Sequence, residues 1–141
     1  MARQLKIFMA ESFYFDTNLL IRWIVWDDEA QATKVQSLID RLPTKKILIA
    51  DIVIAEIVWV LKSVYKLEKN DIAQAVDLII SNPKFSLNQK LFDLILDPWK
   101  DQNSISFADF MIWGYAQLEN SSTLYTFDQK LAKNLENTIL L

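Results

Sequence analysis

Two carboxylates stand inside apolar segments of this 141-residue chain, where a solvated charge is not expected. Glu56 is the only charged residue in 52–61, and Asp109 is the only one in 106–118. Burying an isolated ionised carboxylate costs several kcal/mol, so each acid needs water, a hydrogen-bonding partner or a cation. Glu56 could reach water from the rim of a buried helix, and Asp109 could close a capping box with Ser106. Both alternatives stay open for each residue taken alone.

Two further carboxylates occupy junctions between predicted strands and helices. Asp16 follows the apolar run 13–15, Asp128 follows 124–127, and each precedes a helical pattern. Either residue could serve simply as a helix N-cap, because Asp is among the preferred capping residues. Asp51 has the same placement, and N-capping is its only predicted role.

The elements that must position these acids alternate between short apolar runs and longer helical patterns. The alternation predicts an α/β fold with a central, mainly parallel sheet of four to five strands. The strands are predicted at 13–15, 47–50, 85–87, 124–127 and 139–141. The helices are predicted at 19–26, 29–42, 52–65, 70–82, 89–96, 106–118 and 128–135, with Asn70 or Asp71 as a cap and Pro98 as a stop signal. We expect one domain over 1–141, with 1–11 as an N-terminal extension and Met1 or Met9 as the start.

The placement of the four acids relative to the sheet links them. In a parallel α/β sheet the strand-to-helix junctions lie at the carboxyl edge, where such sheets bind ligands. All four acids lie at or near such junctions, so we expect their side chains to converge. Carboxylates ~5 Å apart repel by about 3 kcal/mol per pair at an effective dielectric of about 20, which favours a bound cation. A carboxylate-held Mg²⁺ also binds substrate phosphate, so the cluster indicates phosphodiester hydrolysis.

Composition narrows the chemistry and the metal. The chain has no Cys, no His and one Gly, which excludes thiolate or imidazole metal ligands, histidine bases and glycine-rich phosphate loops. Oxygen-only ligation therefore indicates Mg²⁺, with Mn²⁺ as a substitute. A net charge of −3 argues against binding nucleic acid by bulk electrostatics. No apolar run reaches the length of a membrane span and no signal peptide is evident, so we expect a cytoplasmic protein with no membrane partner.

Four short motifs, in this order along the chain, resemble those of the PIN domain family. They are Phe15-Asp16-Thr17-Asn18-Leu19-Leu20, Ala55-Glu56-Ile57-Val58-Trp59-Val60-Leu61, Ser106-Phe107-Ala108-Asp109 and Tyr125-Thr126-Phe127-Asp128. Over about 13–141 the chain most resembles the small ribonuclease toxins of the VapC kind. The resemblance implies a three-layer α/β/α fold with the parallel sheet between helices. It also implies a Mg²⁺-dependent endoribonuclease that acts as the toxin of a type II toxin–antitoxin pair.

The resemblance implies roles for individual side chains as well. The four acids would be catalytic and would hold the metal, with Glu56 on a metal-bound water or a second metal and the direct ligands being Asp16, Asp109 and Asp128. The residues that orient these carboxylates by hydrogen bonds would be Thr17, Asn18 and Thr126. The candidates for phosphate contacts are Arg22, Lys130 and Lys133. The alternative is that these three side chains are solvated surface charges. Metal-activated water would attack a phosphodiester, and the choice of RNA over DNA rests on the resemblance alone.

Partners follow from the same resemblance. A VapC-like toxin would cleave RNA, pair into a homodimer, and be neutralised by an antitoxin, often a helix docked in an apolar groove. Candidate groove residues, with core aromatics as the alternative, are Trp23, Trp26 and Trp59. Two other classes stay open: a PIN-like module that binds RNA or protein without a toxin role, and a small Mg²⁺-dependent phosphatase. Haloacid-dehalogenase-like phosphatases expect Asp-x-Asp at the first strand, whereas this chain has Asn18 there.

Overall fold

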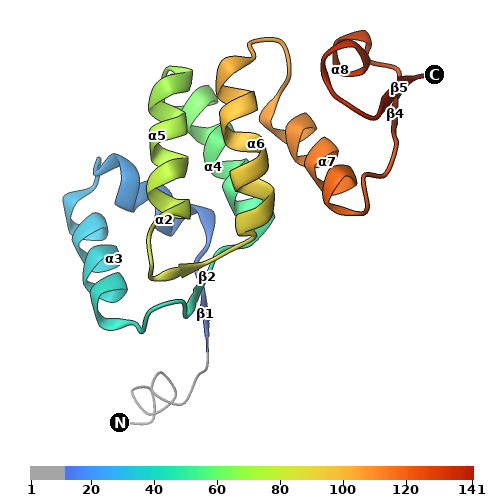
Figure 1. Ribbon diagram of the computed structural model, residues 1–141. Helices are drawn as coiled ribbons and strands as arrows, with labels where there is room; N and C mark the ends of the chain where they lie inside the picture. Colours follow the sequence, from blue (N-terminus) through green and yellow to red (C-terminus); the bar gives the residue numbers. More distant parts are fainter. Residues whose placement is uncertain (1–11) are drawn as a thin grey trace.

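The computed structural model of the protein describes residues 12–141 (Figure 1). The predicted extension over 1–11, including the alternative start at Met9, lies outside the described residues. Within them, helices and strands alternate as predicted. In chain order the elements are β1 (Phe13–Tyr14), α2 (Thr17–Val25), α3 (Glu29–Arg41), β2 (Ile47–Leu48), α4 (Asp51–Ser63), α5 (Lys69–Ile80), β3 (Phe85–Ser86), α6 (Gln89–Asp101), α7 (Phe107–Leu118), β4 (Leu124–Thr126), α8 (Gln129–Asn134) and β5 (Thr138–Leu140).

Every strand pairing among these residues is parallel. β2 lies between β1 and β3, with Ile47 opposite both Phe13 and Phe85. β4 pairs with β5, with Leu124 opposite Thr138. The predicted α/β class is confirmed, and the helix-rich chain with parallel strands agrees with a three-layer α/β/α organisation.

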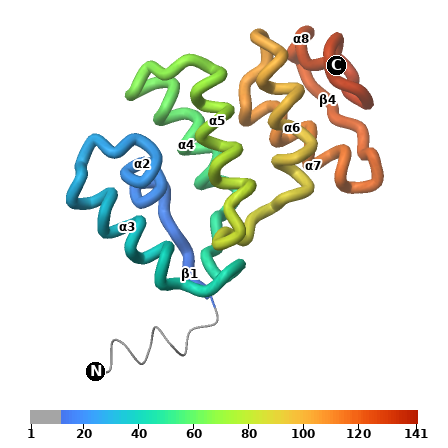
Figure 2. The backbone as a smooth tube through the Cα atoms, turned by 60° about the vertical axis from the view of Figure 1, so that its left-hand side comes forward, coloured from blue at the N-terminus to red at the C-terminus, as the bar shows by residue number. Residues whose placement is uncertain are grey.

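The five strands are divided between two sheets, which differs from the single central sheet that we expected. β1, β2 and β3 form one sheet, and β4 and β5 form another. Figures 1 and 2 show the unit of β4, α8 and β5 at the opposite end of the molecule from α2 and α3. The separation has a local cause, because the Trp113 indole N–H and the Asn137 amide donate hydrogen bonds that tie the C-terminal unit to α7.

The core consists of aliphatic and aromatic side chains from both ends of the chain. Phe85 of β3 is 1% exposed and meets Phe15 and Trp23 edge-on, at ring-centroid distances of 6.3 Å and 5.6 Å. Trp23 thus packs as a core aromatic rather than as a groove residue. Gly114 marks the crossing of α6 and α7, since a Cβ there would lie 2.6 Å from Cδ1 of Leu91.

Three predicted helix boundaries are wrong. Asp51 begins α4 instead of capping it, and its carboxylate accepts hydrogen bonds from the Asn88 amide (3.0 Å) and the Tyr115 hydroxyl (2.5 Å). α5 begins at Lys69, so neither Asn70 nor Asp71 is its cap. For Asp51, the tertiary hydrogen bonds override the local preference for capping.

Pro98 does not end α6, which continues to Asp101. Proline inside a helix removes a backbone hydrogen bond and costs about 3 kcal/mol or more. The residue after it compensates, because Trp99 is buried and meets Phe107 edge-on at 5.1 Å. The Lys69 ammonium also donates to the Trp99 carbonyl oxygen at 3.0 Å, which anchors this last turn. No helix of residues 12–141 combines the length and apolarity that crossing a membrane requires.

Candidate active site

The first acid of the predicted quartet stands at the start of α2. Asp16 is exposed and its Oδ1 accepts a hydrogen bond from the Leu19 backbone N–H at 3.0 Å, so it is the N-cap of this helix. An ionised carboxylate has about four acceptor positions, so Asp16 can cap the helix and still accept other partners through its second oxygen. Asp16 also lines a hollow of about 490 Å³, together with Asn18, Arg22 and Lys34.

Thr17 connects this junction to the second acid. Its hydroxyl donates a 2.7 Å hydrogen bond to Oε2 of Glu56, from one strand-to-helix junction to the helix that follows the next strand. Glu56, 39 positions further along the chain, is therefore held beside Thr17, the residue that follows Asp16. The bond joins the segments that carry the first two acidic motifs at the carboxyl edge of the sheet.

Glu56 lies on an exposed apolar face of α4. Its neighbours Ile52 and Trp59, one turn away on either side, are 63% and 62% exposed. Glu56 itself is exposed, so its carboxylate is solvated and hydrogen-bonded instead of buried. Its neighbours along α4 are apolar, as the sequence indicated, and within residues 12–141 the polar side chain that reaches it is Thr17 of α2.

Ser106 and Asp109 form one half of the predicted capping box, and within residues 12–141 no hydrogen bond joins the Asp109 carboxylate to the Ser106 backbone N–H. The Ser106 hydroxyl oxygen accepts a hydrogen bond from the Asp109 backbone N–H at 3.1 Å, and Ser106 is the N-cap of α7. This bond uses the backbone of Asp109 and leaves its half-buried carboxylate as a separate group. α7 packs beside α4, the helix that carries Glu56.

Asp128 is the N-cap of α8. Its Oδ1 accepts from the backbone N–H groups of Lys130 (2.8 Å) and Leu131 (3.2 Å). The Thr126 hydroxyl oxygen accepts a hydrogen bond from the Asp128 backbone N–H at 2.9 Å, whereas the predicted bond was to the Asp128 carboxylate. The residue lies in the C-terminal unit, at the far end of the molecule from α2 in both views (Figures 1 and 2).

The four acids are thus not all brought together within one chain. Asp16 and Glu56 are linked through Thr17, whereas Asp128 belongs to the separate β4–β5 unit. Across residues 12–141 no group of three or more acidic side chains lies close enough to hold a metal ion. Two carboxylates are too few for a closed magnesium site, although the metal can be held by one or two carboxylates with waters and substrate phosphate. The expected four-carboxylate cluster is therefore absent from the arrangement described here.

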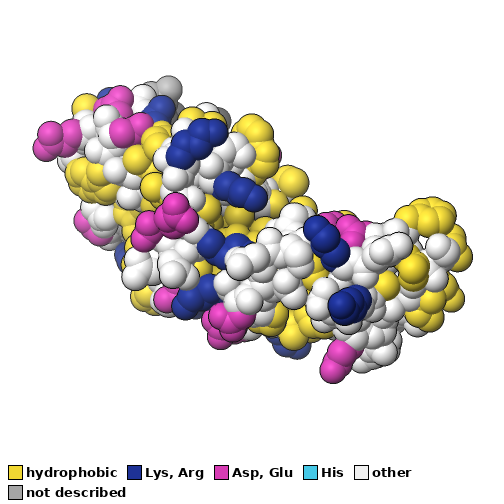
Figure 3. Space-filling model, turned by 90° about the horizontal axis from the view of Figure 1, so that it is seen from above, with side chains coloured by type: hydrophobic (Ala, Val, Ile, Leu, Met, Phe, Trp, Pro, Cys, Tyr) yellow, Lys and Arg dark blue, Asp and Glu magenta, His cyan; other side chains and the backbone are white. Residues whose placement is uncertain are grey.

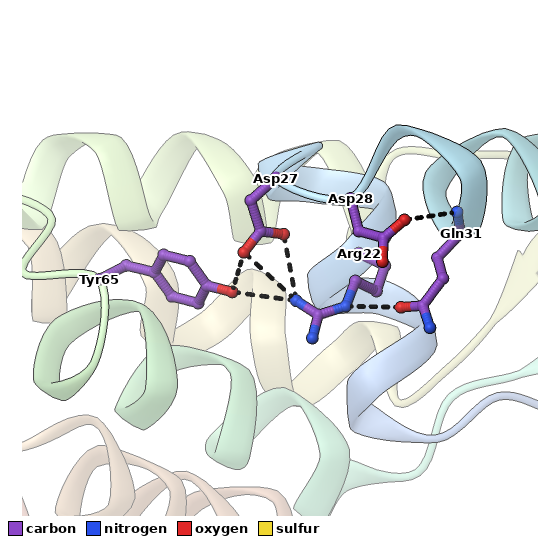
Figure 4. Close-up of polar contacts among 5 residues, drawn as sticks. All are labelled: Arg22, Asp27, Asp28, Gln31 and Tyr65. Atoms are coloured by element: carbon purple, nitrogen blue, oxygen red, sulfur yellow. Dashed lines mark hydrogen bonds and ion pairs between the residues drawn. The ribbon is translucent and has the colours of Figure 1, made fainter.

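The predicted phosphate contacts have different surroundings. Arg22 donates hydrogen bonds to Asp27 (3.1 Å), Gln31 (2.8 Å) and the Tyr65 hydroxyl (3.2 Å), as Figure 4 shows. The Tyr65 hydroxyl, which donates to Asp27, and the nearby guanidinium hold the pKa of Asp27 below its ordinary value. Arg22 is thereby fixed at the edge of the hollow beside Asp16, whereas Lys130 and Lys133 are exposed on α8.

Sequence reasoning missed two groups at this end of the fold. Lys34 reaches the hollow from α3, and a single lysine on a polar helix face carries no signal of that position. Asp51, Asn88 and Tyr115 form a polar cluster that joins α4, α6 and α7. Burial and the acceptor Asp51 raise the pKa of Tyr115 to about 12. The three residues lie far apart in the chain, so only the packing of the helices reveals the cluster.

Comparison with known families identifies the fold. The sequence model of the PIN domain matches residues 13–135, which includes all four acidic motifs. The chain belongs to the PIN domain family, whose fold is generally that of nucleases. Comparison with curated proteins gives no match.

Proposed function

We propose that the protein is a metal-dependent endoribonuclease that hydrolyses RNA phosphodiester bonds. The observation that carries the proposal is the hydrogen bond from Thr17 to Glu56, which joins the first two acidic motifs of a PIN domain across the sheet edge. The choice of RNA and of the VapC kind rests on the resemblance of the four motifs.

The donor set that would hold the metal consists only of carboxylates: Asp16, Glu56, Asp109 and Asp128. Hard oxygen donors suit Mg²⁺ or Mn²⁺, which when bound would activate water and neutralise charge on the phosphate. Catalysis by this set requires Asp109 and Asp128 to join the pair that Thr17 already links. Thr17 and Thr126 would then keep Glu56 and Asp128 in fixed orientations.

The hollow beside Asp16 would take a phosphate of the RNA backbone at its polar rim. The amide of Asn18 and the cations of Arg22 and Lys34 lie there next to the proposed metal-holding carboxylate, and the rest of the lining includes the apolar side chains of Leu19, Val35 and Leu38. Positive side chains that flank an acidic site would hold a phosphate on either side of the scissile bond. This supports a local phosphate contact in a chain whose net charge is −3.

A toxin role would add an antitoxin that covers the exposed aromatic face. Trp59 lines a hollow of about 550 Å³ between α4, the start of α5 and α7, whose apolar part includes Val58, Trp99 and Phe107 and whose polar part includes Lys62 and Lys69. A helix with apolar side chains at successive turns would fit this groove. Trp59 is the candidate that this geometry favours, whereas Trp26 occupies the C-cap of α2.

The separation of Asp128 from Asp16 favours a second candidate, a PIN-like module that binds RNA or protein without cutting. Incubation with structured RNA and with a chromogenic phosphate ester, each with and without Mg²⁺, distinguishes the readings. Our proposal predicts cleavage of RNA only, and only with the metal. RNA bound but intact would support the binding module, and hydrolysis of the ester alone would indicate a phosphatase.

A further inference from the structure

We propose that a second copy of this chain completes the sheet and the acidic site by strand exchange. β4 of each copy would pair with β1 of the other, which brings Asp128 of one copy to Asp16 and Glu56 of its partner. The exchange of strands rests on the structure alone. Its role in catalysis rests on the proposed function.

Within residues 12–141, the edge of β1 that faces away from β2 pairs with no strand and can accept another parallel one. The backbone N–H groups of Phe13 and Phe15 donate to Lys46 (2.8 Å) and Leu48 (3.2 Å) on the β2 side. Because successive backbone groups of a strand point to opposite edges, the N–H and C=O of Tyr14 face away from β2. β1 is an edge strand of its sheet, so these two groups lie where a further strand would bind.

β4 has the matching edge. The Leu124 N–H donates to Asn137 at 2.8 Å, and the Thr126 carbonyl accepts from Leu141 at 2.9 Å, both on the β5 side. By the same alternation the N–H and C=O of Tyr125 face the other edge. Pairing of this edge with β1 would form one five-stranded parallel sheet in the order β3-β2-β1-β4-β5, with the last two strands from the second copy.

Large apolar side chains accompany both edges. Tyr14 on β1 is 73% exposed, and Phe127, directly after β4, is 79% exposed. The C-terminal unit carries more exposed apolar residues, namely Tyr125, Ile139, Leu140 and Leu141. Figure 3 shows hydrophobic side chains gathered at the end of the molecule that this unit forms. Exposed apolar surface beside an open strand edge indicates an interface, because natural proteins otherwise protect such edges.

The occupant is a second copy because the C-terminal unit is fastened to its own α7. The Trp113 indole donates to the Glu136 carbonyl oxygen at 2.9 Å, and the Asn137 amide donates to Gln117 at 3.1 Å. The connection from α7 is folded as well, since the Ser122 N–H donates to the Ala116 carbonyl at 2.8 Å. Closure within one chain would break either these contacts or the packing of α7 on α4 and α6, which includes the Tyr115 hydrogen bond to Asp51, whereas exchange between two chains keeps both. A reciprocal exchange has two-fold symmetry and buries both edges at once.

The PIN domain match gives an independent reason to join the two parts. One family unit spans 13–135 and includes β1, β4 and all four acids. In the chain described here these strands belong to separate sheets. An exchanged dimer restores the whole unit twice, each time from two chains.

Light scattering tests the assembly without reference to activity. The 16.4 kDa chain should have the mass of a dimer, and Tyr14→Pro should raise the dimer dissociation constant by about tenfold or more. Proline removes the N–H that faces the free edge, while the N–H groups of Phe13 and Phe15 still bind β2. Tyr14→Ser is the matched control, because it also loses the ring but keeps that N–H, and it should weaken the dimer less than the proline does. Unchanged circular dichroism of the proline variant shows that the chain still folds, and a monomeric wild type overturns the proposal.

Mixed dimers test which chain supplies each acid. In co-expressed Asp16→Asn and Asp128→Asn chains, half of the dimers are mixed, and one of the two sites in each is intact. About a quarter of wild-type RNA cleavage should return. Co-expression of Asp16→Asn with Glu56→Gln is the control. It should recover no cleavage, because both acids of a site come from the same chain and every site in the mixed dimer therefore lacks one of them. No recovery in the first pair, with an active wild type, overturns the exchange.

A cross-link separates this proposal from the proposed function. The chain has no Cys, so Tyr14→Cys and Tyr125→Cys can be placed on separate chains and joined with a short bismaleimide. The exchange predicts a covalent dimer of the two variants. If the cross-linked dimer forms but the wild type does not cleave RNA, the strand exchange stands and the nuclease function is rejected. Nuclease activity without a cross-link would keep the nuclease and reject the exchange.

Discussion

The two ends of this molecule each present acidic residues at a strand-to-helix junction, but they differ in what holds those residues. At one end, Thr17 of α2 reaches Glu56 of α4, so the site depends on how two strands are placed in one sheet. At the other end, the side chains of Asp128 and Thr126 accept hydrogen bonds from backbone N–H groups within three residues. The first region is built by tertiary structure and the second by local capping.

The difference explains why a capping aspartate and a catalytic aspartate look alike in sequence. Asp16 caps α2 and Asp128 caps α8 with the same kind of hydrogen bond. A cap uses one or two of the acceptor positions of a carboxylate and leaves the others open to a cation. Capping and metal binding are therefore compatible, and the partner across the sheet decides whether the second role exists.

The largest expected effect is a loss of RNA cleavage, and it should be equal for substitutions at the two ends of the molecule. Asp16→Asn and Asp128→Asn should each lower RNA cleavage by about 100-fold or more, because each removes a charge from the metal-holding set. Stability without metal should stay equal or rise, since Asn also caps helices and like-charge repulsion falls. Cleavage assays and thermal unfolding check this, with exposed Asp97→Asn as the control. Unfolding of either variant would instead indicate that capping is the main role.

A smaller effect concerns the joint that carries the C-terminal unit. Gly114→Ala should lower the free energy of unfolding by about 1 kcal/mol, because overpacking costs about 1–3 kcal/mol and the gain in helix propensity returns about 1. The added Cβ would lie 2.6 Å from Leu91 and 2.9 Å from Ile95, both fully buried. Urea unfolding measures the loss. A second substitution, Leu91→Ala, should add less in the Gly114→Ala background than in the wild type.

Capping at the C-terminal end gives an effect of similar size that separates structure from charge. Asp128→Ala should destabilise the chain by about 1 kcal/mol, because the Lys130 and Leu131 N–H groups lose their acceptor. Asp128→Asn should show no such loss, because the Asn side-chain oxygen can accept the same hydrogen bonds. Urea unfolding of the two variants compares them. Equal losses would show that the charge, and not the cap, stabilises α8.

The smallest effect concerns the polar cluster between α4 and α7. Burial, and then the hydrogen bond to Asp51, raise the pKa of Tyr115 to about 12. A raised tyrosine pKa contributes stability that is fully present below about pH 10 and is lost as pH rises through about 12. Ultraviolet titration should show one tyrosine that ionises late, and Tyr115→Phe should remove that step. Retention of the late step would assign it to another tyrosine.

The sequence predicted the elements well and their assembly only in part. Alternating apolar runs located the strands, and Asp16, Ser106 and Asp128 marked helix starts, because capping acts over three residues. Asp51 and Pro98 misled the prediction, since distant partners decide their surroundings. The convergence of four acids needs the edges of β1 and β4 to meet, and no local pattern states whether one chain or two provides those edges.

Metal binding by wild type and Asp128→Asn is the most direct test of the account, because it asks whether the two ends share one ion. Calorimetric titration with Mn²⁺ at protein concentrations that favour dimers should show binding to the wild type. The Asp128→Asn variant should bind Mn²⁺ at least about tenfold more weakly, since it has one carboxylate fewer to hold the metal. Equal affinity of the two proteins would contradict the account and would leave Asp128 as the cap of α8 alone.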